Sequence, residues 1–161
     1  MKATAIRTTL SAAAVAALGT VTVLAAPAQA ATATYLSNVR TGAHPTFDRV
    51  VLDFTAGVPA YGISDVPGGL RNCGSGDPIT LPGATHFYEL DVAAAAHDAN
   101  GNPTYTGPRV VSTNLPSVKG WAITCDFEGR LKVGVGTAGP VREVATFPLT
   151  GPSRIVMDVR R

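Results

Sequence analysis

The segment AHDANGNPTYTGPR, residues 96–109, holds the side chains best suited to ligand chemistry. Tyr105 offers a flat amphipathic ring of the kind that stacks on sugars. Arg109 offers a planar guanidinium that can grip a carboxylate with two hydrogen bonds, and His97 and Asp98 lie earlier in the same segment. We therefore take these four as candidate ligand-binding residues, although the Asn-Gly and Asn-Pro steps also favour a purely structural connection made of turns.

The same segment gives little support to catalysis or metal binding. His97 and Asp98 are neighbours whose side chains point apart on an extended chain, and the sequence has no Gly-x-Ser-x-Gly elbow to supply a nucleophile. Asp98, Asn100 and Asn102 alternate as calcium ligands do, but Gly101 comes one position early and no Glu closes the loop. The three histidines are dispersed. We predict no catalytic residue, no metal and no cofactor.

Three further features favour structural interpretations over chemical ones. Glu89 and Asp91 would share one face of a strand, as paired carboxylates do, but a solvated face explains them equally well. Trp121 lies in an apolar run and is expected to be a core anchor rather than a sugar platform. Gly134, Gly136 and Gly139 are followed by neither Lys nor a helix, so they indicate a bent strand and a turn rather than a phosphate loop.

Short strands must position these residues, because the chain has apolar alternation broken by Gly, Pro, Asn and Asp and no long helical period. The pattern predicts one all-β domain, either a two-sheet β-sandwich of about eight to nine short strands or a distorted barrel. One helical turn is possible at Ala93–Ala96. The expected strands cover residues 34–39, 49–54, 60–66, 86–92, 109–112, 118–127, 131–135, 143–148 and 154–159.

Two of these strands carry the same pattern, RVVLDF at 49–54 and RIVMDV at 154–159. Alternation places apolar side chains on one face, which we expect to face the core. The opposite face carries Arg49, Asp53, Arg154 and Asp158.

Three accounts of this repeat remain open. If the strands are antiparallel neighbours with Val51 opposite Val156, Arg49 faces Asp158 and Asp53 faces Arg154. Internal duplication would instead place each copy at the equivalent position of its own sheet. Chance is the third account, because valines and flanking charges are common in strands.

The N-terminus, residues 1–30, is predicted to be a secretory signal peptide. Lys2 and Arg7 precede a long uncharged run that ends in the small-residue site Ala28-Gln29-Ala30. No stop-transfer segment follows, so no membrane anchor is expected after cleavage. The remaining domain, residues 31–161, is formally neutral and lacks a basic stripe, which argues against a nucleic-acid partner.

The two cysteines, Cys73 and Cys125, are predicted to form one disulfide, because export exposes them to oxidation. Closing a loop of about 50 residues would contribute about 4 kcal/mol in the chain-entropy model. A catalytic thiol would leave the second cysteine unexplained, and a zinc site would need further ligands nearby.

Several separated stretches resemble the AMIN-like domain of secreted actinobacterial proteins, and together they span nearly the whole of residues 31–161. They are VRTGAHPTFDRVVLDF, AHDANGNPTYTGPR, DFEG and FPLTGPSRIVMDV. The family is related to the AMIN domain of cell-wall amidases and secretion-pore proteins. The resemblance implies a sandwich of two similar sheets and a noncatalytic role in peptidoglycan binding or envelope localisation. The cysteine pair is a departure from the family pattern.

We therefore predict a secreted, noncatalytic module, extracellular or associated with the cell wall, whose partner is peptidoglycan or another cell-envelope component. A polar sheet face and the segment 96–109 would make the contact. The first alternative is a protein-interaction module that pairs through a sheet edge or loop. The second is a small secreted hydrolase or inhibitor, which would require titratable groups to converge in one cleft.

Overall fold

The computed structural model describes residues 33–161, and the signal peptide predicted for residues 1–30 lies outside this part of the chain. The described residues contain strands, turns and loops, with no helix that could cross a membrane. The strands are β1 (Leu36–Ala43), β2 (Phe47–Phe54), β3 (Tyr61–Asp65), β4 (Leu70–Arg71), β5 (Pro78–Ile79), β6 (His86–Val92), β7 (Val110–Ser112), β8 (Val118–Phe127), β9 (Arg130–Thr137), β10 (Glu143–Leu149) and β11 (Arg154–Arg160).

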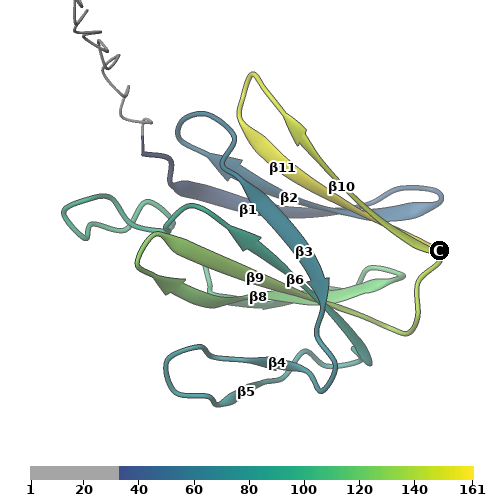
Figure 1. The fold of residues 1–161 in the computed structure, drawn as a ribbon. Helices are drawn as coiled ribbons and strands as arrows, with labels where there is room; N and C mark the ends of the chain where they lie inside the picture. Colours follow the sequence, from purple (N-terminus) through teal and green to yellow (C-terminus); the bar gives the residue numbers. More distant parts are fainter. Residues whose placement is uncertain (1–32) are drawn as a thin grey trace, which may run out of the picture. The chain divides into compact units, whose positions relative to one another are not determined.

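Two antiparallel sheets pack face to face, and the predicted all-β sandwich is confirmed (Figure 1). One sheet has the order β1-β2-β11-β10, and the other has the order β3-β6-β9-β8-β7. The core between them is built by side chains that point inward from every second residue along the strands, as the period of two requires. Its fully buried side chains include Val50, Leu52, Leu90, Val133, Val135, Ile155 and Met157.

The repeated pattern brings β2 and β11 together as antiparallel neighbours, in the register that the sequence predicts. Val51 lies opposite Val156, and Arg49 lies opposite Asp158. The Arg49 guanidinium donates from Nε and Nη2 to the two Asp158 carboxylate oxygens at 2.7 and 2.8 Å. Because both copies lie in one sheet, their placement at equivalent positions of two sheets is wrong.

The second predicted pair of the repeat does not form. Asp53 lies opposite Arg154, but its carboxylate accepts two 2.8 Å hydrogen bonds from Arg40 on the other side, in β1. Arg154 instead donates to the carbonyl oxygen of Pro152 at 3.1 Å. The bidentate geometry available from β1 decides the partner of Asp53.

A third, smaller layer was not predicted. Residues 66–85, here called the flap, contain β4 and β5 and lie on the outer face of the five-stranded sheet (Figure 1). Leu70 and Leu81 of the flap pack on Ala122. A predicted disulfide, Cys73–Cys125, is confirmed and joins the flap to β8.

The glycines of β9 form the floor on which the flap rests. A Cβ at Gly134 would lie 2.5 Å from two carbons of the Leu70 side chain, and one at Gly136 would lie 2.7 Å from the Cβ of Ala84. A glycine inside a strand often marks such a close approach. The glycines from which a bent strand is predicted therefore also provide a second packing surface.

The helical turn predicted at Ala93–Ala96 is wrong. Ala95 instead forms a parallel bridge with Tyr35, and its carbonyl oxygen accepts a 2.8 Å hydrogen bond from the Leu36 amide. Burial of Ala94, Ala95 and Ala96 against the rest of the domain overrides their helical propensity.

Candidate functional site

The segment 96–109 meets the end of β8 at a cluster of three titratable side chains, His97, Arg109 and Asp126, here called the Asp126 cluster. Nη1 and Nη2 of Arg109 each lie 3.3 Å from Oδ2 of Asp126. Oδ1 of Asp126 accepts a 3.0 Å hydrogen bond from the Ala96 amide and lies 3.8 Å from Nε2 of His97. The Asp126 side chain is only 9% exposed, whereas that of Arg109 is 52% exposed.

Backbone pairing fixes both charged partners of the cluster. Arg109 directly precedes β7, and its carbonyl oxygen accepts a 2.8 Å hydrogen bond from the Ile123 amide of β8. Asp126 lies near the end of β8, just before a tight turn in which Glu128 has φ 49° and Gly129 has φ 72°. Two successive positive φ values are typical of the turns that close two-residue hairpins. The cluster is thus held at the rim of the five-stranded sheet.

His97 contacts Asp126 through its Nε2 atom. Its Nδ1 lies 3.0 Å from the carbonyl oxygen of Asp98. A carbonyl oxygen can only accept, so Nδ1 carries the proton in that bond. His97 therefore adds a positive charge beside Asp126 only when its second nitrogen is protonated as well.

The carboxylate of Asp98 folds its own loop and forms no hydrogen bond with the Asp126 cluster. Its carboxylate accepts hydrogen bonds from the amides of Asn100 and Asn102 at 2.9 and 2.8 Å, and from the Asn102 side chain at 2.9 Å. These bonds, the Asn102 side-chain bond first, hold the pKa of Asp98 below its usual value. Self-contained bonding of this kind is the structural role of an Asx turn.

Tyr105 does not fit the stacking role predicted for it. Its side chain belongs to the core, is 8% exposed and meets Trp121 edge to face, with ring centroids 6.3 Å apart. Its hydroxyl donates to the carbonyl oxygen of Pro108 at 2.8 Å, and burial raises the pKa of Tyr105. The ring faces are therefore closed to a sugar, whereas the core position predicted for Trp121 is confirmed.

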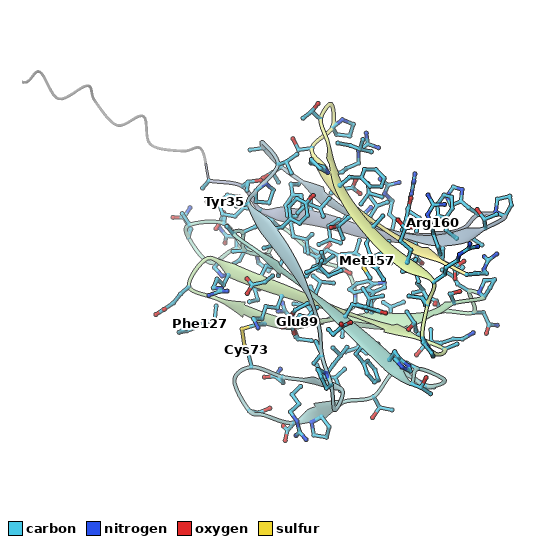
Figure 2. All side chains as sticks on the ribbon, turned by 45° about the vertical axis from the view of Figure 1, so that its right-hand side comes forward. Tyr35, Cys73, Glu89, Phe127, Met157 and Arg160 are labelled. Atoms are coloured by element: carbon cyan, nitrogen blue, oxygen red, sulfur yellow. A yellow bond between two sulfur atoms is a disulfide. The ribbon has the colours of Figure 1, made fainter. Side chains whose placement is uncertain are left out.

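An exposed aromatic side chain missed by sequence reasoning lies beside Arg109. Phe127 ends β8 and is 64% exposed. It lines a depression of about 390 Å³, here called the Arg109 hollow. The other lining residues are Asn72, Cys73, Gly74, Arg109, Ile123, Thr124, Cys125 and Asp126. Figure 2 shows Phe127 and Cys73 at the same end of the domain. The signal in the sequence was an aromatic residue at the end of an expected strand, directly before the Glu128-Gly129 pair.

A second depression lies on the other side of the Asp126 cluster. It also encloses about 390 Å³, and its lining residues are Ala96, His97, Pro103, Tyr105, Thr106, Gly107, Arg109 and Asp126. Arg109 thus stands between two recesses. Asp126 accepts hydrogen bonds from only some of the five N–H donors of Arg109. The Arg109 guanidinium can therefore also bind a carboxylate of a ligand.

The remaining candidate carboxylates are ion-paired across β6 and β9. Glu89 accepts hydrogen bonds from Lys132 at 2.7 Å and from Thr124 at 2.8 Å, and Asp91 pairs with Arg130. Residues 33–161 contain no group of three or more His, Cys, Asp or Glu side chains placed to hold a metal. Neither observation makes a catalytic pair of Glu89 and Asp91.

Comparison with known proteins places the domain in a family. Searches among curated proteins and among solved structures found no match. A model of the AMIN-like domain matches residues 34–161, which is nearly all of the chain that the structure describes. The chain therefore belongs to the AMIN-like domain family.

Proposed function

We propose that this protein is a secreted, noncatalytic module of the cell envelope that binds peptidoglycan through the Arg109 hollow. Membership of the AMIN-like family suggests a module related to the cell wall. The observation that carries the proposal is the juxtaposition of an exposed aromatic ring, Phe127, and a half-exposed guanidinium, Arg109, in one recess.

The two side chains match two parts of the polymer. The Phe127 ring would stack on the apolar face of a sugar, and Arg109 would donate to a carboxylate of a muramic lactyl group or stem peptide. Asp126 holds Arg109 from the buried side, and the Cys73–Cys125 disulfide holds the opposite wall. A recess that needs no rearrangement loses less entropy on binding.

The contacts of the Asp126 cluster support binding rather than hydrolysis. In the described residues, neither His97 nor Asp126 is hydrogen-bonded to a Ser, Thr or Cys side chain that could be activated as a nucleophile. The side-chain partner of Asp126 Oδ2 is instead the guanidinium of Arg109. Such an arrangement suits charge recognition.

Cosedimentation of the purified, oxidised domain with insoluble peptidoglycan at low and high salt tests the proposal. Phe127→Ala and Arg109→Ala should each reduce the apparent affinity about tenfold, a central value for truncating an interface anchor. Ile63→Ala and Arg142→Ala remove exposed side chains of similar kinds outside the hollow and should retain full binding. Equal retention by all four variants, each with unchanged thermal stability, would eliminate the Arg109 hollow as the wall-binding site.

An interaction module for proteins is the second candidate, because β1 offers an open edge. β1 (Leu36–Ala43) is an edge strand that contains no proline and whose partner in the sheet is β2. Its first residue, Leu36, is also bonded to Ala95 and Thr104, so the open edge begins after Leu36. An extended segment of another protein could add to it as a further strand. Capture of an envelope protein that survives complete removal of glycan would favour this function over wall binding.

A further inference from the structure

A third recess, here called the flap groove, lies between the flap, the start of β6 and the β9–β10 connection. It encloses about 720 Å³ and lies mostly over apolar side chains of the flap, of β6 and of the β9–β10 connection. Val66, Ile79, Phe87 and Val141 are partly exposed there, whereas Leu70 and Leu81 are only 1% and 3% exposed. Val66, Ile79 and Phe87 are only partly covered by the small core beneath the flap. Apolar surface is therefore available inside the recess.

Among the residues that line the flap groove, Asp65 is the one Asp, Glu, Lys or Arg, and His86 lines the groove as well. Asp65 lies at its rim, at the end of β3 and opposite Tyr88 of β6. No Lys or Arg lines the groove, and Asp65 forms no ion pair within residues 33–161. Burial, and secondarily the charge of Asp65, raise the pKa of Tyr88, so the phenol stays neutral. An apolar groove with one unpaired carboxylate complements an apolar molecule with one positive charge.

We propose that the flap groove binds a small amphiphile, with its apolar chain on the flap and β6 and its ammonium group paired with Asp65. The volume lies within the range of about 300–1,000 Å³ that is usual for small-molecule sites. The walls are fixed in advance, because the Cys73–Cys125 disulfide and the close seat of Leu70 on Gly134 hold the flap. This site is separate from the Arg109 hollow and does not depend on the proposed wall binding.

Three probes with the same apolar chain separate the charge from the hydrophobic contribution: n-octylammonium, n-octanol and n-octanoate. Titrations of the oxidised domain at pH 8 can follow the amide resonances of Gly68, Gly69 and Phe87 by NMR. We expect n-octylammonium to bind about fivefold more tightly than n-octanol, as one ion pair near a protein surface allows. The anionic probe should bind most weakly.

Two matched substitutions locate the charge. Asp65→Asn should reduce the affinity for n-octylammonium to that for n-octanol. Asp77 is in the flap but does not line the groove, so Asp77→Asn should leave both affinities unchanged. Ile79→Ser, in the apolar wall, should weaken all three probes. The proposal is overturned if n-octanoate binds as well as n-octylammonium, if Asp65→Asn leaves the affinity unchanged, or if the shifted resonances lie outside the groove.

Discussion

Replacing Gly134 with alanine should force the flap away from the five-stranded sheet. A Cβ at this position would lie 2.5 Å from both Cδ1 and Cδ2 of Leu70. Apolar carbons pack at about 3.5–4.0 Å, so Leu70 must move by about 1 Å. Leu70 is buried against Leu81 and Ala122. We therefore expect overpacking to lower the free energy of unfolding by about 1–3 kcal/mol.

A double-mutant cycle with Leu70→Ala isolates this contact. Leu70→Ala alone should lose about 2–5 kcal/mol, because it leaves a cavity under the flap. In the double variant, the methyl group added at position 134 enters the space that Leu70 vacates. The Gly134→Ala penalty should then nearly disappear, which gives a coupling of about 1–3 kcal/mol. Gly62→Ala is the matched control, since a Cβ there meets nothing within 4 Å.

Urea unfolding of the oxidised domain, followed by the fluorescence of the buried Trp121, measures all four stabilities of the cycle. Two results would refute the reasoning. Strictly additive losses would show that position 134 and Leu70 do not compete for the same space. A Gly134→Ala variant as stable as Gly62→Ala would show that the flap does not rest on β9.

Three further predictions concern other contacts. Arg161→Ala should lower the unfolding free energy by about 2–3 kcal/mol in urea titrations, because Asp48 is fully buried and would keep only its backbone donors; unchanged stability would contradict this. Arg49→Ala should lower the unfolding free energy by about 1–3 kcal/mol, because it removes the bidentate bond to Asp158. Arg154 bonds only a nearby carbonyl oxygen, so Arg154→Ala should lower it by less than about 0.5 kcal/mol. Equal losses in the two variants would mean that the bidentate bond is unimportant. Because the pKa of Asp98 is lowered in the fold, its contribution is present above the ordinary range near 4 and is lost as the pH falls below that range. The protection factors of the amides in residues 98–102, which correct exchange rates for their intrinsic pH dependence, should therefore fall only in strong acid. A loss of protection near pH 6 would contradict the assignment.

The register of β2 and β11 could be predicted because it depends only on alternation and charge. With the apolar sets facing the core, one antiparallel alignment places both arginines opposite aspartates, and the structure has that alignment. The ion pairing was only half predictable. Asp53 has β1 on its other side, and nothing in the two repeated segments indicates that Arg40 would supply the better-placed guanidinium.

The candidate site shows the same division between pattern and tertiary context. The sequence indicates that Arg109 is a charged residue in a turn-rich segment, and the structure leaves it half exposed. Residue type alone cannot show whether an aromatic ring faces outward. Tyr105 is closed off by Trp121, whereas Phe127 lies at the uncovered end of a strand. Asp126 was not identified, because its partners come from residues 96, 97 and 109, which only the fold brings together.

The flap escaped prediction because its strands have two residues each, too few for any periodicity. Its docking surface was visible in VGVGT of β9, where valines point into the core and glycines alternate with them on the outer face. Such a face has no side chains of its own to solvate, which indicates close contact with another layer. Both outward glycines are accounted for by flap residues, Leu70 and Ala84.

The flap is not needed to complete the main core, and this bears on why the domain carries it. The side chains buried between the two sheets come entirely from outside residues 66–85. The flap buries only Leu70 and Leu81 on a floor of small residues, and it is joined to β8 by the disulfide. Its tip, at Asn72–Gly74, forms a wall of the Arg109 hollow, and its base forms a wall of the flap groove. The flap stabilises the domain through Leu70 and the disulfide, but it also shapes two recesses, which is consistent with the binding functions proposed for them.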